Sequence, residues 1–343
     1  MWIGKNWLKW FFKTGIILFL VLGGCWGGAA IYFNCFGPSW LKILCVTSFT
    51  ALFSGAFFFC RSFFRATLVC FIFFIVFLFW WNSLQPSNSK DWAPDVARIS
   101  HGEIVGDRLT MYNVRDFRYT DEDTFQEHWR TKEYDLKKLQ GLDIFLSYWA
   151  SDNIAHLITS WDFGDDGHLA VSIETRKDKT HKNYAVKGFF KQYELSYVAA
   201  DERDIVGLRT NFRKERVYFY RRVTPKGLPR ALLEEYLLEM NRLVITPEFY
   251  NTFSRNCATM ANRHVETITK GGSFFPDWRL ILSGHLDELL YEEGALQNYA
   301  LSFAELRQKS RIDLQMQKYD RDDFSKRLRE LVPDFVNANT IEK

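Results

Sequence analysis

Residues 66–81 read ATLVCFIFFIVFLFWW, an uncharged apolar run of the kind that crosses a bilayer as a helix. Two further uncharged runs precede it, Thr14–Phe33 and Ile43–Phe59. A helix rises 1.5 Å per residue, so about 20 residues span the hydrocarbon core. The sequence therefore predicts three transmembrane helices within residues 1–83, which act as an α-helical anchor.

The first run could instead be a cleaved signal peptide, because it has a basic start. Two further runs follow it, however, and the small residues of Gly23–Ala30 read as a helix-packing face rather than a cleavage region. We therefore expect the first run to remain as a membrane span.

The basic residues between the runs set the expected orientation. Three lysines precede the first run, the Asn34–Trp40 loop carries no Lys or Arg, and the next loop carries Arg61 and Arg65. Basic loops stay in the cytoplasm, so the third helix should lead outward. Everything after about Asn82 is then expected outside the cytoplasm.

Charge is divided sharply along the chain. The whole chain has a formal net charge of +3, while residues 1–83 contain six basic residues and no acidic one, so the remainder carries −3. A near-neutral domain has no electrostatic footprint for nucleic acid, and we expect no nucleic-acid partner.

Cysteine placement also limits the possible functions. Of six cysteines, only Cys257 lies beyond residue 83. A disulfide framework and a cysteine-based zinc cluster are therefore excluded within the domain, and no metal or cofactor is expected.

The polar part of the chain divides into a linker at residues 84–100 and a domain at 101–343. Helical periodicity is clearest in Arg230–Val244, and a second helix is expected from near Cys257 to Ile268. Strands flanked by separate helices indicate an α+β domain. The predicted strands are Arg108–Val114, Ala155–Asp162, Leu169–Thr175, Tyr193–Ala199, Ile205–Thr210 and Arg216–Arg222.

Cys257 is a candidate nucleophile because it follows a polar turn at the expected start of a helix. The positive end of the helix dipole and the unpaired N–H groups there favour the thiolate, and they could stabilise an oxyanion. The alternative is a buried, inert cysteine that acts as a small apolar residue.

A thiol nucleophile usually needs a histidine partner. His156 and His168 bracket a predicted hairpin, whose register places Glu174 beside His156 and puts His168 about 20 Å away along the strand. We predict His156 as the base and Glu174 as the residue that orients it. His168 could be a solvated turn residue, Glu174 could pair with Arg176 or a neighbouring lysine, and His264 is expected to be structural.

The histidine strand, the acidic strand and the distant Asn-Cys helix occur within a longer set of motifs. These are Tyr134-Asp135-Leu136, Asp143–Trp149, Ile154-Ala155-His156, Ala170–Arg176, Asp201–Asp204, Leu208–Arg213, Tyr250-Asn251-Thr252, Asn256-Cys257, Asp277-Trp278-Arg279 and Ser283-Gly284.

In this arrangement, roughly from Asp116 to Ile312, the chain resembles the circularly permuted papain-like superfamily. It resembles most closely the Lnb-type lipoprotein N-acyltransferases, formerly a conserved domain of unknown function. Two positions depart from the pattern. Leu157 stands where the family commonly has a hydroxyl residue, and Ala258 stands where it commonly has Thr.

The resemblance implies a cysteine acyltransferase. It would move an acyl chain from a membrane phospholipid, through a Cys257 thioester, to the N-terminal amine of a diacylglyceryl-cysteine lipoprotein. It also implies candidates for oxyanion or substrate contacts beyond the catalytic trio of Cys257, His156 and Glu174. These are Asn256, Ser172, Arg176 and Tyr148.

Two other functions fit the same residues. A membrane-tethered cysteine peptidase or amidase could use the same dyad and release its product to water. A non-catalytic envelope scaffold that binds lipoproteins would instead bury Cys257 far from every histidine.

Overall fold

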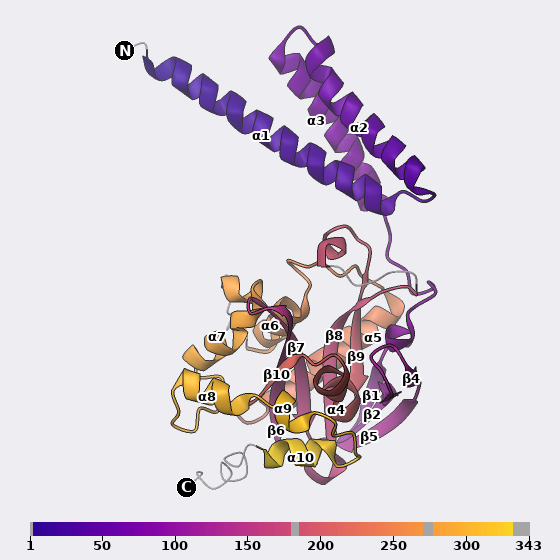
Figure 1. Ribbon diagram of the computed structural model, residues 1–343, viewed down its shortest axis with the longest axis vertical. Helices are drawn as coiled ribbons and strands as arrows, with labels where there is room; N and C mark the ends of the chain where they lie inside the picture. The colour runs from indigo at the N-terminus through magenta and orange to yellow at the C-terminus, as the bar shows by residue number, and fades with distance from the viewer. Residues whose placement is uncertain (1–2, 180–184, 270–276, 332–343) are drawn as a thin grey trace. The chain divides into compact units, whose positions relative to one another are not determined.

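The computed structural model describes residues 3–179, 185–269 and 277–331 (Figure 1). The chain divides into two compact units: residues 1–87 with 183–192, and residues 88–182 with 193–343. The boundary at Ser87 and Asn88 falls inside the stretch expected to be a linker. Residues 88–100 belong to the second unit, where Val96 is buried in an apolar cluster.

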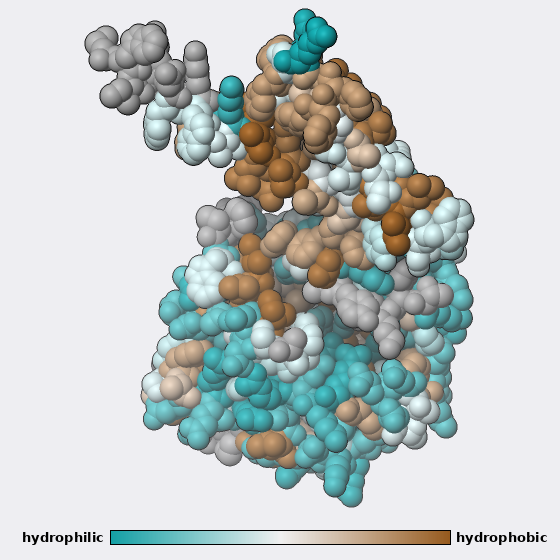
Figure 2. All heavy atoms as spheres, turned by 45° about the horizontal axis from the view of Figure 1, so that its top comes forward, coloured by the Kyte–Doolittle hydropathy of each residue, from teal (hydrophilic) through white to brown (hydrophobic). Residues whose placement is uncertain are grey.

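The first unit contains the predicted anchor. Within residues 3–83 there are three long helices: α1 Ile3–Asn34, α2 Ser39–Phe59 and α3 Phe63–Ser83. All three are long and apolar enough to cross a membrane. Figure 2 shows apolar side chains gathered on these helices, whereas the second unit is largely polar in the face shown. Exposed apolar residues of the three helices include Phe19, Phe71 and Phe79. The three-helix prediction is confirmed.

The helices pack through the small residues of the Gly23–Ala30 stretch. A Cβ atom on Gly27 would lie 2.8 Å from the ring of Phe49 on α2, and one on Gly23 would lie 3.3 Å from Phe74 on α3. These close contacts favour residues without a side chain, as in other membrane helix pairs.

The first unit also takes in the short helix η4, Ala185–Phe189, and the residues that follow it. The ring of Phe190 stacks on Phe33 with centroids 4.9 Å apart, and the Asn34 side-chain amide donates to the Phe190 carbonyl at 3.0 Å. Lys191 donates to the Trp81 carbonyl at 2.7 Å. Phe190 and Lys191 therefore pack with the ends of α1 and α3.

The second unit is built on one mixed sheet, which comprises eight strands among the described residues. The strand order is β1-β2-β9-β8-β7-β6-β10, with β5 paired to β2; β2 and β9 meet in parallel and the other pairs are antiparallel. The strands are β1 His101–Val105, β2 Arg108–Arg115, β5 Trp129–Asp135, β6 Gly141–Ser151, β7 Ile154–Asp162, β8 His168–Arg176, β9 Glu194–Ala200 and β10 Arg216–Arg221, with a separate small pair, β3 Arg118–Tyr119 and β4 Phe125–Gln126.

Helices cover both faces of this sheet, and alternate side chains of each strand enter different cores. On one face, Leu157 and its neighbours pack with α5 Leu228–Ile245, α6 Cys257–Thr269, α7 Leu286–Glu292 and α8 Phe303–Ser310. On the other, Ile158 packs with a second group of short helices. These are α4 Glu202–Ile205, α9 Asp313–Met316 and α10 Phe324–Glu330. The π-helical turn η5 Leu208–Phe212 follows α4 and packs in a separate cluster with Phe117 and Tyr119.

The α+β class, the hairpin and both predicted helices are confirmed, but the strand predicted at Ile205–Thr210 is wrong. Asp201 accepts a hydrogen bond from the Arg203 backbone N–H and so begins helix α4. β6 was not predicted, because Gly141–Tyr148 is buried on both faces and has no alternating pattern.

Candidate active site

The site forms where two neighbouring strands separate. The β7–β8 ladder runs from Asp162↔His168 only as far as Ile158↔Ser172. Beyond that point β7 stays paired with β6 and β8 stays paired with β9. The backbone of residues 155–157 is therefore free of β8, and other groups fill the gap.

The loop at Ser283-Gly284 occupies one part of this gap. The Ser283 hydroxyl donates to the Ala155 carbonyl at 2.6 Å and accepts from the Ala155 N–H at 3.1 Å. The Gly284 N–H donates to the Asn153 carbonyl at 2.9 Å. A Cβ atom on Gly284 would lie 2.0 Å from the Asp152 carbonyl oxygen, so this approach requires glycine.

Cys257 occupies the adjacent part, as the first residue of α6. The Asn256 side-chain oxygen accepts from the Thr259 N–H at 2.8 Å, and its amide donates to the Thr252 carbonyl at 2.9 Å. Asn256 is thus the cap of α6 and holds Cys257 at the helix start, where unpaired N–H groups favour an anion. The Leu157 N–H, released from β8, hydrogen-bonds the sulfur.

His156 faces this thiol from β7 and is held by two polar residues of β8. Its Nε2 lies 2.6 Å from the Ser172 hydroxyl and 3.3 Å from Glu174 Oε1. The Ser172 hydroxyl donates to Glu174 at 2.7 Å, so it accepts from His156 Nε2–H. Both contacts use Nε2, which leaves Nδ1 for the hydrogen bond to Cys257.

The charges of the site favour an ion pair between the ring and the sulfur. Burial acts to lower the pKa of His156, but the charges of Glu174 and Cys257 outweigh it and raise that pKa to about 9. Burial acts to raise the pKa of Cys257, but the charge of His156, its hydrogen bond and the Leu157 N–H lower it. A thiolate beside an imidazolium is the nucleophilic form of a cysteine.

Two further residues shape the site; both lie in motifs quoted from the sequence, which assigned them no role. Arg209, in the π-helical turn η5, donates to Glu174 at 3.0 Å and is buried. Burial acts to raise the pKa of Glu174, but the charges of His156 and Arg209 outweigh it and hold that pKa well below its usual range. Burial and the nearby charges of Cys257 and Glu174 raise the pKa of Tyr250, so its phenol stays protonated. Arg209 is the one charged residue in the mostly apolar run 205–210, and this pattern could have indicated a buried arginine with a carboxylate partner.

Other candidates have their contacts elsewhere. Arg176 donates to the carbonyls of Val96 and Ala97 and lies over the Trp92 ring, so it holds the start of the second unit. Tyr148 donates to the Gly284 carbonyl and accepts from Arg307. The structure therefore does not bring either side chain to the thiol.

The remaining buried histidines also lie away from Cys257. His168 Nε2 is 3.3 Å from Asp162 at the closed end of the hairpin. His264 Nε2 is 2.7 Å from the Tyr197 hydroxyl, and burial lowers its pKa to about 4. Across the described residues, no group of three His, Cys, Asp or Glu side chains could hold a metal.

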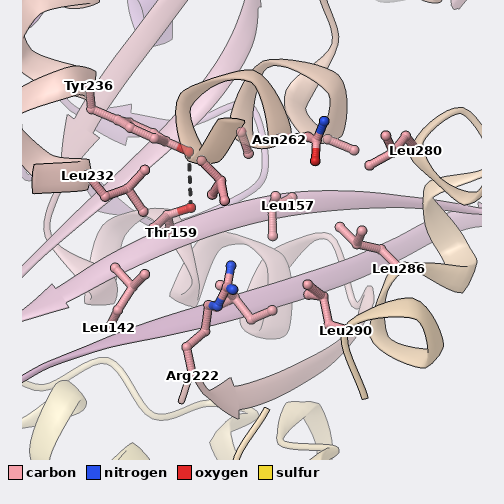
Figure 3. A pocket seen from close by; sticks show the side chains of 14 residues that line it. Leu142, Leu157, Thr159, Arg222, Leu232, Tyr236, Asn262, Leu280, Leu286 and Leu290 are labelled. Carbon is pink, nitrogen blue, oxygen red and sulfur yellow. Dashed lines mark hydrogen bonds between the residues drawn. The ribbon is translucent and has the colours of Figure 1, made fainter. Parts of the chain in front are cut away.

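A pocket opens beside the nucleophile, on the α5–α6 face of the sheet (Figure 3). Leu157 and Ala258, the chain neighbours of His156 and Cys257, line it together with Leu142, Leu232, Leu286 and other aliphatic residues. The polar side chains on its wall are Thr159, Arg222, Tyr236 and Asn262. The two residues that depart from the family pattern thus both extend the apolar surface.

Three apolar helices and a mixed α+β domain, with a buried thiol beside a partly buried imidazole and carboxylate, define a membrane-anchored domain with a cysteine site. Residues 125–284 match the family model of the Lnb N-terminal periplasmic domain, and this range includes His156, Glu174 and Cys257. No curated protein and no solved structure matches the chain. The chain thus combines three helices that are long and apolar enough to cross a membrane with a domain that is similar, over residues 125–284, to the Lnb N-terminal periplasmic domain.

Proposed function

We propose that the protein is a lipoprotein N-acyltransferase of the bacterial inner membrane, with Cys257 as nucleophile, His156 as acid and base, and Glu174 as the residue that orients the imidazole. The observation that carries this proposal is the buried Cys257–His156 contact backed by Ser172 and Glu174. We further propose that the domain is a permuted papain-like fold, which the arrangement of a Cys helix start against a His strand supports.

In the first half-reaction the Cys257 thiolate attacks an ester carbonyl of a phospholipid and forms a C–S bond. The N–H groups at the start of α6 stabilise the oxyanion. When the C–O ester bond breaks, His156 donates its proton to the departing alkoxide, and a lysolipid leaves.

In the second half-reaction the N-terminal amine of a diacylglyceryl-cysteine lipoprotein attacks the thioester. The neutral His156 takes a proton from that amine, a C–N bond forms, and the C–S bond breaks. The thiolate and the imidazolium are thereby regenerated, and the acceptor carries a new amide. Glu174, held by Arg209, stabilises the imidazolium that is present before the first half-reaction and is regenerated after the second.

The pocket favours a lipid over a peptide as the acyl source. An acyl chain exposed to water costs about 0.8 kcal/mol per CH₂, so a substrate with a long chain needs an apolar space next to the reacting sulfur. The leucine-rich wall that begins at Leu157 and Ala258 supplies such a space.

The test is transfer by the full chain in phospholipid vesicles to a synthetic diacylglyceryl-cysteine peptide. We expect the peptide to gain one acyl group as an amide. In Cys257→Ser the rate of this transfer should fall by at least about 1,000-fold. The matched control is Ser254→Ala, which alters an exposed hydroxyl near the same turn. Release of free fatty acid without acylated peptide would instead identify a hydrolase.

A further inference from the structure

One residue of the pocket beside Cys257 does not suit a purely apolar ligand. Arg222 follows the end of β10, and its backbone N–H donates to the Leu142 carbonyl at 2.9 Å. Its guanidinium points into the pocket, among aliphatic side chains that include Leu142 and Leu290 (Figure 3). A positive charge therefore lies on a wall that is otherwise mostly hydrocarbon.

This charge has no counterion in the part of the chain that the structure describes. Arg222 Nε is buried without a hydrogen-bond partner, and no carboxylate of the described residues forms an ion pair with the side chain. The neighbouring Arg221 is different, because it pairs with Asp143 at 2.7 Å and Asp162 at 2.8 Å. Burial lowers the pKa of Arg222, yet a guanidinium remains protonated at neutral pH.

A buried charge is retained at a cost unless something pairs with it, and a guanidinium is suited to two oxygens of one anion. The lining of the pocket is largely aliphatic, which matches an alkyl chain. A free inorganic anion would leave that lining without a partner, whereas a neutral lipid would leave Arg222 unpaired.

We propose that this pocket binds a single-chain anionic amphiphile, with its carboxylate or phosphate on Arg222 and its alkyl chain against the leucines. The binding of this amphiphile does not depend on the proposed acyl transfer. Its effect on activity, however, rests on the proposed function. Because Leu157 and Ala258 line the same space, an anionic amphiphile competes there with the acyl donor and slows transfer.

Binding is tested with the full chain and three soluble probes of equal chain length: octanoate, octyl phosphate and octanol. We expect the two anions to bind wild type at least about 10-fold more tightly than octanol. Arg222→Met, which keeps length and removes the charge, should abolish that difference, and Arg222→Lys should keep part of it. Arg230→Met is the matched control, since it removes an exposed arginine paired with Asp107 and Glu234.

Three results would overturn the site. One is octanol binding to wild type as tightly as octanoate, which needs no variant. Another is an unchanged preference for anions in a folded Arg222→Met protein. The third is inorganic phosphate binding as tightly as octyl phosphate, which would remove the role of the leucines. Absence of acyl transfer would refute the proposed function and leave this binding comparison intact.

The competition is a separate measurement. Octanoate should raise the apparent KM for the phospholipid donor at unchanged kcat, and it should do so in the Arg230→Met protein and not in the Arg222→Met protein. Inhibition that is equal in both variants would contradict a shared pocket, even where the binding preference is found.

Discussion

The two ends of the β7–β8 hairpin carry similar residues in different surroundings. At each end a histidine Nε2 lies 3.3 Å from a carboxylate oxygen: His168 from Asp162 at the turn, and His156 from Glu174 at the open end. At the turn the strands are paired, and Asp162 is also bound to Arg221. At the open end the strands separate, and Cys257, the first residue of α6, lies beside β7. A histidine–carboxylate pair is therefore a structural tie in one place and a candidate catalytic group in the other, and the strand separation makes the difference.

Replacing the two histidines one at a time is the largest test of this comparison. His156→Ala should reduce acyl transfer by about 10²- to 10⁴-fold, because the thiol loses its base and its ion-pair partner. His168→Ala should leave the rate per folded molecule within a few-fold of wild type, while it lowers the free energy of unfolding by about 1–3 kcal/mol. Rates from both variants, with thermal unfolding as a control for folding, check the pair. Equal loss of activity would show that the two ends do not differ in function.

The separated strands are maintained by Gly284, whose replacement should affect stability more than chemistry. Gly284→Ala places a methyl group against the Asp152 carbonyl, and we expect a loss of about 3 kcal/mol in the free energy of unfolding. Gly207→Ala is the matched control, since its nearest contact would be 3.6 Å away. Chemical denaturation of both variants measures the difference. A Gly284→Ala protein as stable as the control would mean that the loop can withdraw from the gap.

Arg209 at the open end and Arg221 at the closed end each bind a carboxylate, but we expect Arg209 to affect kcat and Arg221 to affect stability. Arg209→Met removes the hydrogen bond to Glu174 and should lower kcat about 10-fold, because the carboxylate is then less firmly placed against the imidazole. Arg221→Met should instead lower stability and leave kcat of the folded enzyme nearly unchanged. Steady-state kinetics on the folded fraction distinguish the two. Loss of kcat in Arg221→Met alone would reverse the assignment.

Alkylation of Cys257 gives the smallest predicted effect and needs no acyl donor. His156 lowers the pKa of Cys257 although burial opposes it, so Cys257, followed by peptide mapping, should react with iodoacetamide at pH 7 several-fold faster in the native protein than in the unfolded protein. Acyl transfer should fall as pH rises through about 9, because His156 then loses the proton that it donates. In His156→Ala the alkylation curve should move to higher pH, and in His168→Ala it should not. Identical curves for both would indicate that neither ring affects the thiol.

Local patterns in the sequence predicted much of this arrangement. Apolar runs gave the three spans, turn residues gave the hairpin and its register, and the polar turn before Cys257 gave the start of α6. These features depend on residues that are near one another in the chain. The placement of His156 beside Cys257 is a proposal that the register made and that the geometry supports.

Features that depend on distant contacts were not predictable in the same way. Arg209 reaches Glu174 across 35 positions, and its segment resembles a strand until Asp201 caps it as a helix. Arg176 was expected near the substrate, yet its donors are used by the backbone of residues 96 and 97. Long charged side chains find partners through the tertiary fold, and the local pattern does not encode which partner is reached.

The most direct test of the central claim is the mass of the protein after incubation with phospholipid alone, without an acceptor. We predict that one acyl group is added, that peptide mapping places it on Cys257, and that hydroxylamine at neutral pH removes it, as expected for a thioester. Cys257→Ser protein should gain no hydroxylamine-sensitive group, and His168→Ala protein should gain the same group as wild type. An unmodified Cys257 in wild type that still acylates the lipoprotein peptide would contradict the account.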